Sequence, residues 1–225
     1  MAYRRVPFGL HEWYHCYSRG VDKRITFESE QDYRRFEQLL YLSNNEALSQ
    51  RASFANDIRH EKIFTIPRGS PLVSIGAYVL MPNHFHLIMQ EVVEGGITKF
   101  MHKVGTAYTM YFNIKNERVG NLFVKPFRSK HIADDRYLKY VVQYVHLNSA
   151  ELFEPKWKEG KVADMKLLQK QLRSYEHGSL QDYINPPRAM GSILNLEACL
   201  LLREDLPPFT TIMQDAAEYY SGLKW

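Results

Sequence analysis

A predicted hairpin in the middle of the chain constrains the fold more than any other feature. Residues Val73–Leu80 (VSIGAYVL) form a continuous apolar run, which is typical of a buried strand. The segment Met81-Pro82-Asn83 supplies turn chemistry, and His84–Gln90 (HFHLIMQ) predicts the next strand. Because so short a connection joins antiparallel neighbours, the sheet of this protein is expected to be largely antiparallel.

Strand and helix patterns alternate on both sides of this hairpin. In chain order they predict a strand at His11–Ser18, a helix at Glu28–Leu42, the hairpin, a helix at Ile97–Lys115, a strand at Leu122–His131 and a helix at Arg136–Leu147. Pro126 favours an edge position or a bulge for the last strand, since proline lacks an N–H for the ladder. This order predicts an α+β fold of ferredoxin-like type, an antiparallel sheet with helices on one face.

The chain after residue 150 is expected to form a C-terminal helical extension. Helical patterns cover residues 163–175 and 195–203, and two proline pairs, at 186–187 and 207–208, interrupt them. The segment 46–71 is polar and irregular, which predicts a helix extension followed by a loop.

Charge and aromatic content point weakly toward nucleic acid. The net charge is +4 with a pI near 8.9, and 13% of the residues are aromatic. Aromatic residues lie among basic ones in Tyr33–Phe36 (YRRF) and Lys125–Lys130 (KPFRSK). Single-stranded DNA is bound by this combination, with cations at phosphates and rings stacked on bases. For either segment alone, the more common explanation is a solvated basic surface with its aromatic residues pointing into the core.

His84 and His86 are the first candidates for chemistry. On a strand they share one face, roughly 7 Å apart, so that both imidazoles can converge on one cation. Phe85 between them is expected to point into the core. A polar sheet face with two ordinary histidines is the alternative.

The predicted helix at Arg136–Leu147 supplies the second candidate group. Tyr140, Tyr144 and Asn148 are spaced four residues apart and therefore share a helix face. Tyrosines at this spacing are also typical of core or interface positions, and an asparagine at a helix end is typical of a C-cap.

Together the two groups resemble a known family. Met81–Ile88 (MPNHFHLI), followed about sixty residues later by Tyr144–Asn148 (YVHLN), resembles the IS200-like (Y1) transposases of the HUH single-strand DNA endonuclease superfamily. The similarity is greatest to the REP-associated tyrosine transposases. Tyr14–Gly20 (YHCYSRG) resembles their first strand, and residues 121–129 resemble a later one. The resemblance implies a catalytic domain at residues 8–150, followed by a partly helical extension at 151–225.

This resemblance implies a metal-dependent single-strand DNA endonuclease and strand transferase. His84, His86 and Asn148 would bind Mg²⁺ or Mn²⁺, and Tyr144 would attack the phosphate near a DNA hairpin to give a 5′-phosphotyrosine intermediate. Tyr140 is the rival nucleophile. Tyr144 is preferred because Asn148 lies one turn beyond it, which is the family spacing, and Tyr140 is then expected to pack or to stack on DNA bases. The candidates for phosphate contacts are Arg19, Lys125, Arg128 and Lys130. Single-stranded hairpin DNA is the implied partner, and both a homodimer and a monomer are compatible with it.

The chain departs from the family pattern at two places. It has Asn148-Ser149 where the family often has Asn-Pro, and Val124-Lys125-Pro126 where it often has Gln-Gly-Arg.

Two other classes of protein remain open at this point. One alternative is a DNA hairpin-binding protein that uses the same scaffold without cutting. The other is a zinc hydrolase that adds a carboxylate to the histidine pair, although no spacing supplies that carboxylate persuasively.

Targeting signals and cysteines favour the cytoplasm. The N-terminus carries two arginines without the apolar stretch of a signal peptide, and no run approaches a membrane span. Cys16 and Cys199 match no metal or redox spacing, which favours a reduced compartment and leaves one disulfide open. A cytoplasmic protein is therefore expected, and the resemblance implies one that is bacterial-type and nucleoid-associated.

Overall fold

Four antiparallel strands form one sheet in the order β2-β3-β1-β4. The computed structural model describes residues 7–46, 60–159, 161–185 and 188–195. The strands are β1 (Trp13–Arg19), β2 (Val73–Met81), β3 (His84–Glu91) and β4 (Arg128–Ile132). β2 and β3 form the hairpin expected from the sequence, and their chain order gives the ferredoxin-like topology.

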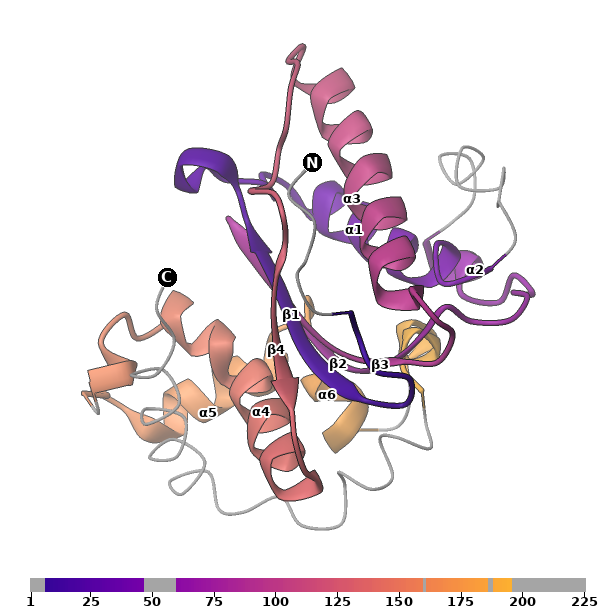
Figure 1. Cartoon of the computed structure of the whole chain (residues 1–225). Helices are drawn as coiled ribbons and strands as arrows, with labels where there is room; N and C mark the ends of the chain where they lie inside the picture. The colour runs from indigo at the N-terminus through magenta and orange to yellow at the C-terminus, as the bar shows by residue number, and fades with distance from the viewer. Residues whose placement is uncertain (1–6, 47–59, 160, 186–187, 196–225) are drawn as a thin grey trace.

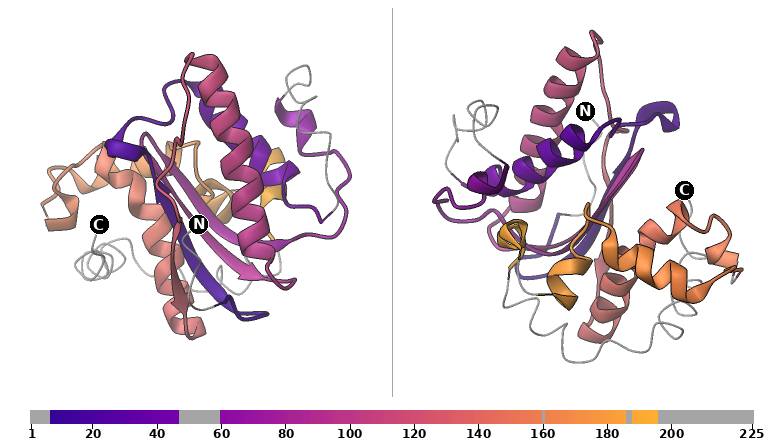
Figure 2. Two further views of the ribbon diagram at one scale, coloured as in Figure 1. Left: turned by 45° about the horizontal axis from the view of Figure 1, so that its top comes forward. Right: turned by 180° about the vertical axis from the view of Figure 1, so that it is seen from behind.

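Helices cover both faces of the sheet (Figures 1 and 2). Helices α1 (Glu30–Leu42) and α3 (Gly96–Lys115) connect the strands and pack together on one face. Helix α4 (Asp135–Leu147) packs against β2 and β3 on the other face. The predicted α+β class is therefore confirmed. The helices were expected on one face of the sheet, whereas α4 lies on the face opposite α1 and α3.

Strand alternation separates the core from the polar face of the sheet. Phe85 points toward α1, where its ring centroid lies 4.8 Å from that of Phe36, and it lies 5.3 Å from the ring of Phe123 in the segment before β4. Its neighbours His84 and His86 therefore point toward α4. A β-bulge between Ile75 and Ala77 shifts the register of β2 against β3.

The fourth strand is shorter than predicted. The sequence predicts a strand at Leu122–His131, whereas β4 begins at Arg128. Before it, Phe123 makes an isolated bridge to Gly20, and Pro126 has no N–H to donate to a ladder.

Residues after α4 extend the sheet edge. They form four short helical turns or helices, η3 (Asn148–Leu152), η4 (Trp157–Glu159), α6 (Leu180–Ile184) and η5 (Ala189–Ile193), together with the ten-residue helix α5 (Met165–Ser174). The Leu80 N–H donates to the His177 carbonyl at 2.9 Å, and the Ser179 N–H donates to the Tyr78 carbonyl at 2.9 Å. The extension thus covers the otherwise open edge of β2.

The sequence patterns identified part of this region. The helix expected at 163–175 is α5, whereas α6 was not expected. The helix expected at 195–203 lies almost wholly outside the described residues, as does Cys199; Cys16 is buried as a free thiol. In the described part of 46–71 the chain forms the short helix α2 (His60–Ile63), and residues 47–59 lie outside the description. The 3-10 turn η1 (Val21–Lys23) lies earlier, after β1. No helix in the described part of the chain is long and apolar enough to span a membrane.

Asp32 fastens α1 to α3. Its buried carboxylate accepts the Ser29 N–H at 3.0 Å in a capping box, and it accepts from Lys115 Nζ at 2.8 Å and Tyr111 Oη at 2.8 Å. Burial alone would raise the pKa of Asp32, but the hydrogen bonds from Lys115 and Tyr111 outweigh it, and the pKa lies below its ordinary 3.8.

Replacing Asp32 with Asn should destabilise the fold by about 2 kcal/mol at pH 7, less than for a fully buried pair because Lys115 is 31% exposed. Because the pKa of Asp32 is lower in the folded state, the ionised carboxylate contributes its full stabilisation above pH 3.8. This stabilisation is lost as the pH falls through the pKa of the folded state. Urea unfolding at pH 7 and pH 3 measures it. Arg34→Ala, which breaks the exposed pair with Glu30, should cost less than about 0.5 kcal/mol. An equal loss from Asp32→Asn at both pH values would contradict the account.

Candidate metal and tyrosine site

The two histidines of the hairpin lie where β3 begins. His84 is 8% exposed and His86 is fully buried, and their ring centroids are 5.1 Å apart. On β1, Arg19 stands opposite His84 and Tyr17 stands opposite His86, so all four side chains share this sheet face.

Helix α4 brings the tyrosine to the same face. Asp134 caps the helix by accepting the Tyr137 N–H at 2.8 Å, and Leu138, Val141 and Val145 are buried as its apolar side. Tyr144 and Asn148, one turn apart, are both fully buried, and Asn148 Nδ2 donates to Tyr144 Oη at 3.5 Å.

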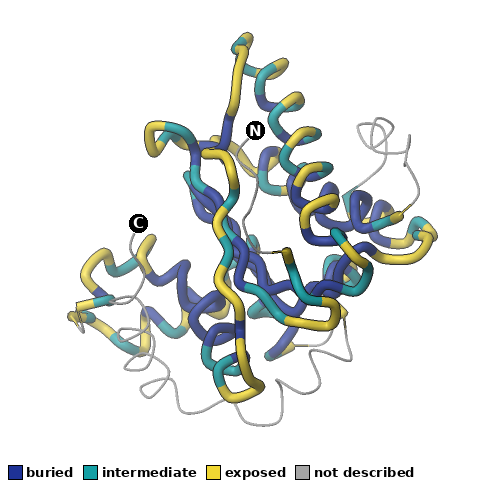
Figure 3. The backbone as a smooth tube through the Cα atoms, in the orientation of Figure 1, coloured by how far each residue is buried: buried dark blue, intermediate teal, exposed yellow. Residues whose placement is uncertain are grey.

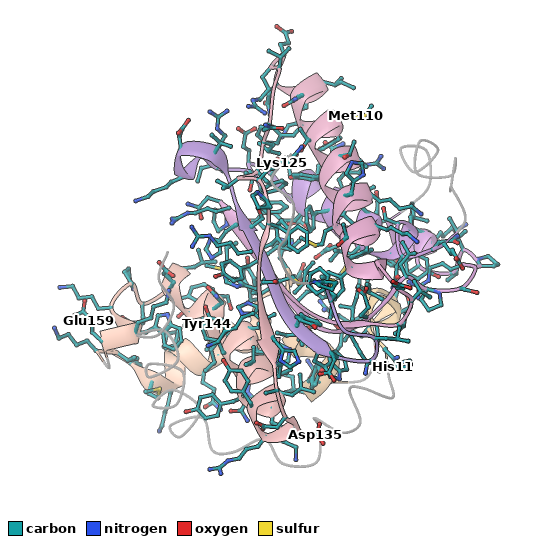
Figure 4. The ribbon with its side chains drawn as sticks, viewed as in Figure 1. His11, Met110, Lys125, Asp135, Tyr144 and Glu159 are labelled. Atoms are coloured by element: carbon teal, nitrogen blue, oxygen red, sulfur yellow. The ribbon has the colours of Figure 1, made fainter. Side chains whose placement is uncertain are left out.

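Helix α4 packs against strand β3, and Figure 4 labels Tyr144 on this helix. The Tyr144 ring lies 5.8 Å from the His86 ring, edge-on. The Asn148 side chain is close enough to His84 to favour its protonated form, against the larger effect of burial. The structure therefore brings together all four residues that the sequence predicts for a metal and nucleophile site.

Two further side chains hold the histidine rings. His84 Nδ1 is hydrogen-bonded to Asn83 Oδ1 at 2.7 Å, and His86 Nδ1 shares a hydrogen bond with His15 Nε2 at 2.8 Å. The His15 ring also lies 5.6 Å from Tyr144, edge-on. No role was predicted for His15 or Tyr17, and Asn83 was expected only as part of the turn. The signal available was alternation, because residues 15, 17 and 19 of β1 share a face.

Burial keeps these imidazoles neutral. It lowers the pKa of His84 to about 4 and that of His15 to about 3, and it lowers the pKa of His86 well below 6.5, with the neighbouring His15 and His84 adding to the effect. A neutral imidazole has one nitrogen lone pair, which is the form that binds a metal ion.

The donor set fits a divalent cation. Asn148 Oδ1 is buried and has no hydrogen-bond partner, which is costly unless another group satisfies it. Two imidazole nitrogens and one amide oxygen suit Mn²⁺ or Mg²⁺. No group of three His, Cys, Asp or Glu residues with metal-binding geometry occurs among the described residues, so the carboxylate that a zinc hydrolase requires is not found there.

Basic residues continue the site along the same sheet face. Arg19 and Arg128 line a cavity of about 220 Å³ together with Tyr17, Lys23 and Pro126. Lys130 stands opposite His15 on β4, and its Nζ lies 5.3 Å from the centre of the Tyr137 ring.

The remaining predicted residues are less central. Lys125 is exposed in the segment before β4, and Tyr140 is half-buried one turn before Tyr144. His146 lies on a different side of α4, where its Nε2 pairs with Ser179 Oγ at 2.9 Å, and it does not contact the tyrosine hydroxyl in any described hydrogen bond.

Tyr144 is covered in this state of the protein. Its side chain is fully buried, and the burial view shows most of α4 as buried backbone (Figure 3). A phosphate can reach its hydroxyl only after α4 or the side chains around it move.

A pair of histidines at the start of β3 thus lies beside a tyrosine on α4 and the asparagine at the C-terminal end of that helix. Comparison with solved structures agrees on the fold: the chain is similar to a REP-associated tyrosine transposase bound to a REP hairpin, with a TM-score of 0.51 over 82% of this chain and 86% of that one. The sequences are 14% identical, so the likeness establishes a shared fold. No protein-family model and no curated protein matches the sequence.

Proposed function

We propose that this protein is a metal-dependent single-strand DNA endonuclease and strand transferase that acts near DNA hairpins. The observation that carries the proposal is the convergence of His84, His86, Tyr144 and Asn148 from elements about sixty residues apart. An ordinary polar sheet face would not need a buried amide oxygen without a hydrogen-bond partner beside a buried imidazole.

The reaction assigned to Tyr144 is an in-line attack on a phosphodiester. Tyr144 Oη forms a bond to phosphorus as the bond from phosphorus to the 3′ oxygen breaks, and the phenol proton ends on that oxygen. The products are a 5′-phosphotyrosine and a free 3′-OH, so a second 3′-OH can reverse the step without ATP. A divalent cation held by His84, His86 and Asn148 would supply Lewis-acid polarisation of a non-bridging phosphate oxygen.

Hairpin-containing single-stranded DNA is the proposed substrate. The structurally similar transposase is bound to a REP hairpin, and Arg19, Arg128 and Lys130 extend the candidate site with positive charge. Residues 8–150 are proposed as the catalytic domain, acting in the cytoplasm at the nucleoid as a monomer or a homodimer.

The test is formation of a covalent protein–DNA adduct. Purified protein is incubated with Mn²⁺ and end-labelled single-stranded oligonucleotides that carry a hairpin with single-stranded flanks, and the mixture is separated on a denaturing gel. Labelled DNA migrating with the protein supports the proposal, and its removal by protease identifies the link. Hairpin binding without an adduct, over a library of flanking sequences, would contradict it.

A non-catalytic hairpin-binding protein is the second candidate, and the complete burial of Tyr144 favours it. The same assay separates the two, because a binding protein retards the hairpin on a native gel and leaves no adduct on a denaturing one.

Arg128→Ala should weaken binding of hairpin DNA roughly five-fold at 0.1 M salt and reduce the salt slope by about 0.7, the value for one phosphate on a single strand. We expect this because Arg128 lies on β4 opposite Tyr17 and lines the cavity that Tyr17 and Arg19 also line. Fluorescence anisotropy between 0.05 and 0.5 M NaCl measures both. Lys99→Ala on α3, an exposed cation on the opposite sheet face, is the matched control and should change neither. Equal effects of the two variants would exclude the proposed DNA path.

A further inference from the structure

Both histidines of the candidate metal site are hydrogen-bonded through the same ring nitrogen. The partner of His84 Nδ1 is Asn83 Oδ1 at 2.7 Å, and the partner of His86 Nδ1 is His15 Nε2 at 2.8 Å. A neutral imidazole carries one proton and one lone pair, so the role of Nδ1 fixes the role of Nε2. These two contacts therefore decide which nitrogen of each ring can bind a cation.

The proton of His84 can be assigned from its surroundings. Asn83 Nδ2 donates to the Lys23 carbonyl oxygen at 3.2 Å, which fixes the amide orientation and turns Oδ1 toward His84. Because a carbonyl oxygen only accepts, His84 Nδ1 is the donor and Nε2 carries the lone pair. Asn83 is held beside His84 by the short turn between β2 and β3, where the backbone carbonyl oxygen of Asn83 accepts from the Gly20 N–H at 2.8 Å.

The His15–His86 pair has two possible proton arrangements, and they have opposite consequences. If His15 Nε2 donated to His86 Nδ1, His86 Nε2 would carry a proton and could not bind a metal ion. If His86 Nδ1 donates to His15 Nε2, His86 Nε2 keeps its lone pair, as in the His84 ring. Metal-binding histidines generally donate their second N–H to such a neighbouring acceptor.

We propose that Asn83 and His15 are positioning residues that hold His84 and His86 as Nδ1–H tautomers, so that both Nε2 atoms face the cation together with Asn148 Oδ1. The inference rests on the proposed metal site and adds the two residues that prepare it. His15 is suited to this role because it is fully buried at the middle of β1, with its ring 5.0 Å from Tyr17 and 5.6 Å from Tyr144.

The first measurement needs no metal. Nitrogen-15 NMR of the metal-free protein, with labelled histidine and assignment by His86→Gln, reports which ring nitrogen carries the proton. The expected result is a protonated Nδ1 and an unprotonated Nε2 for both His84 and His86. A proton on His86 Nε2 would overturn the assignment to His15, whatever the protein does to DNA.

The second measurement is Mn²⁺ affinity by calorimetry. His15→Phe and Asn83→Ala should each lower the affinity by about 10- to 100-fold. His15→Gln, whose amide oxygen can accept at the position of Nε2, and Asn83→Asp should restore it to within about three-fold of the wild type. His146→Phe is the matched control, since His146 is also buried but pairs with Ser179, and its Mn²⁺ affinity should be unchanged.

The outcomes separate this inference from the proposed function. Wild-type affinity in His15→Phe and Asn83→Ala, with the wild type binding Mn²⁺ and forming the DNA adduct, overturns the positioning roles and leaves the proposed function intact. A wild type that binds no Mn²⁺ overturns the metal site and the positioning roles together. Loss in His15→Phe that His15→Gln fails to rescue assigns His15 to packing alone and also overturns its role.

Discussion

Tyr144→Phe is expected to abolish the covalent DNA adduct, with a loss of at least about 10³-fold in the rate of its formation. The substitution removes the only atom that can form the phosphotyrosine bond and leaves the ring that packs beside His15 and His86. Binding of the hairpin should stay within about two-fold, because phosphate contacts from basic residues supply most of the affinity. Denaturing and native gels run on the same samples measure the two quantities.

Tyr140→Phe is the matched control for this prediction. Tyr140 lies one turn earlier on the same helix, α4, and is half-buried. No described contact joins its side chain to His84 or His86. The adduct should form at the wild-type rate. Folding should also be preserved in Tyr144→Phe, because the hydroxyl makes a long bond of 3.5 Å with Asn148, and its loss costs less than about 1 kcal/mol. An adduct that persists in Tyr144→Phe and disappears in Tyr140→Phe would move the nucleophile by one turn.

His84→Leu and His86→Leu should each remove detectable Mn²⁺ binding and reduce adduct formation by at least about 10²-fold. Leucine keeps much of the volume of the buried imidazole and removes its nitrogen lone pair, so the loss reports ligation more than packing. EDTA should abolish the adduct in the wild type, and added Mn²⁺ should restore it. Calorimetry and the denaturing gel assay measure these effects.

His146→Leu separates metal binding from the general cost of losing a buried histidine. His146 pairs with Ser179 and lies 4.6 Å from the Tyr183 ring, away from the metal candidates. It should lower the unfolding midpoint comparably and leave the Mn²⁺ affinity unchanged. Retained Mn²⁺ affinity in both His84→Leu and His86→Leu would exclude these residues as ligands.

Local patterns predicted the elements that carry the candidate site. The apolar run of β2, the turn at Pro82-Asn83 and the alternation in β3 are each set by neighbouring residues, and they placed His84 and His86 on one face. The Asp134 cap and the apolar spacing of Val141 and Val145 similarly located α4 to within one residue. The resemblance to the Y1 transposases joined the two, since no local pattern states that β3 and α4 meet.

Long-range pairing set what local patterns could not predict. The role of His15 depends on the β1–β3 register. This register makes His15 the diagonal neighbour of His86, which is seventy-one residues away in the sequence. The coverage of the β2 edge by residues 177–179 depends on contacts across about one hundred residues. The burial of Tyr144 likewise follows from how α4 seats against the sheet, whereas its sequence pattern specified only a helix face.

Identification of the DNA-linked residue by mass spectrometry tests the central claim most directly. The adduct formed with Mn²⁺ and a hairpin oligonucleotide is digested with nuclease and protease, and the peptide carrying the residual nucleotide is fragmented to distinguish Tyr140 from Tyr144. The account predicts a nucleotide joined through its 5′-phosphate to Tyr144, and a released strand that ends in a 3′-OH. A nucleotide on another residue, or cleaved DNA with a free 5′-phosphate and no protein link, would contradict it.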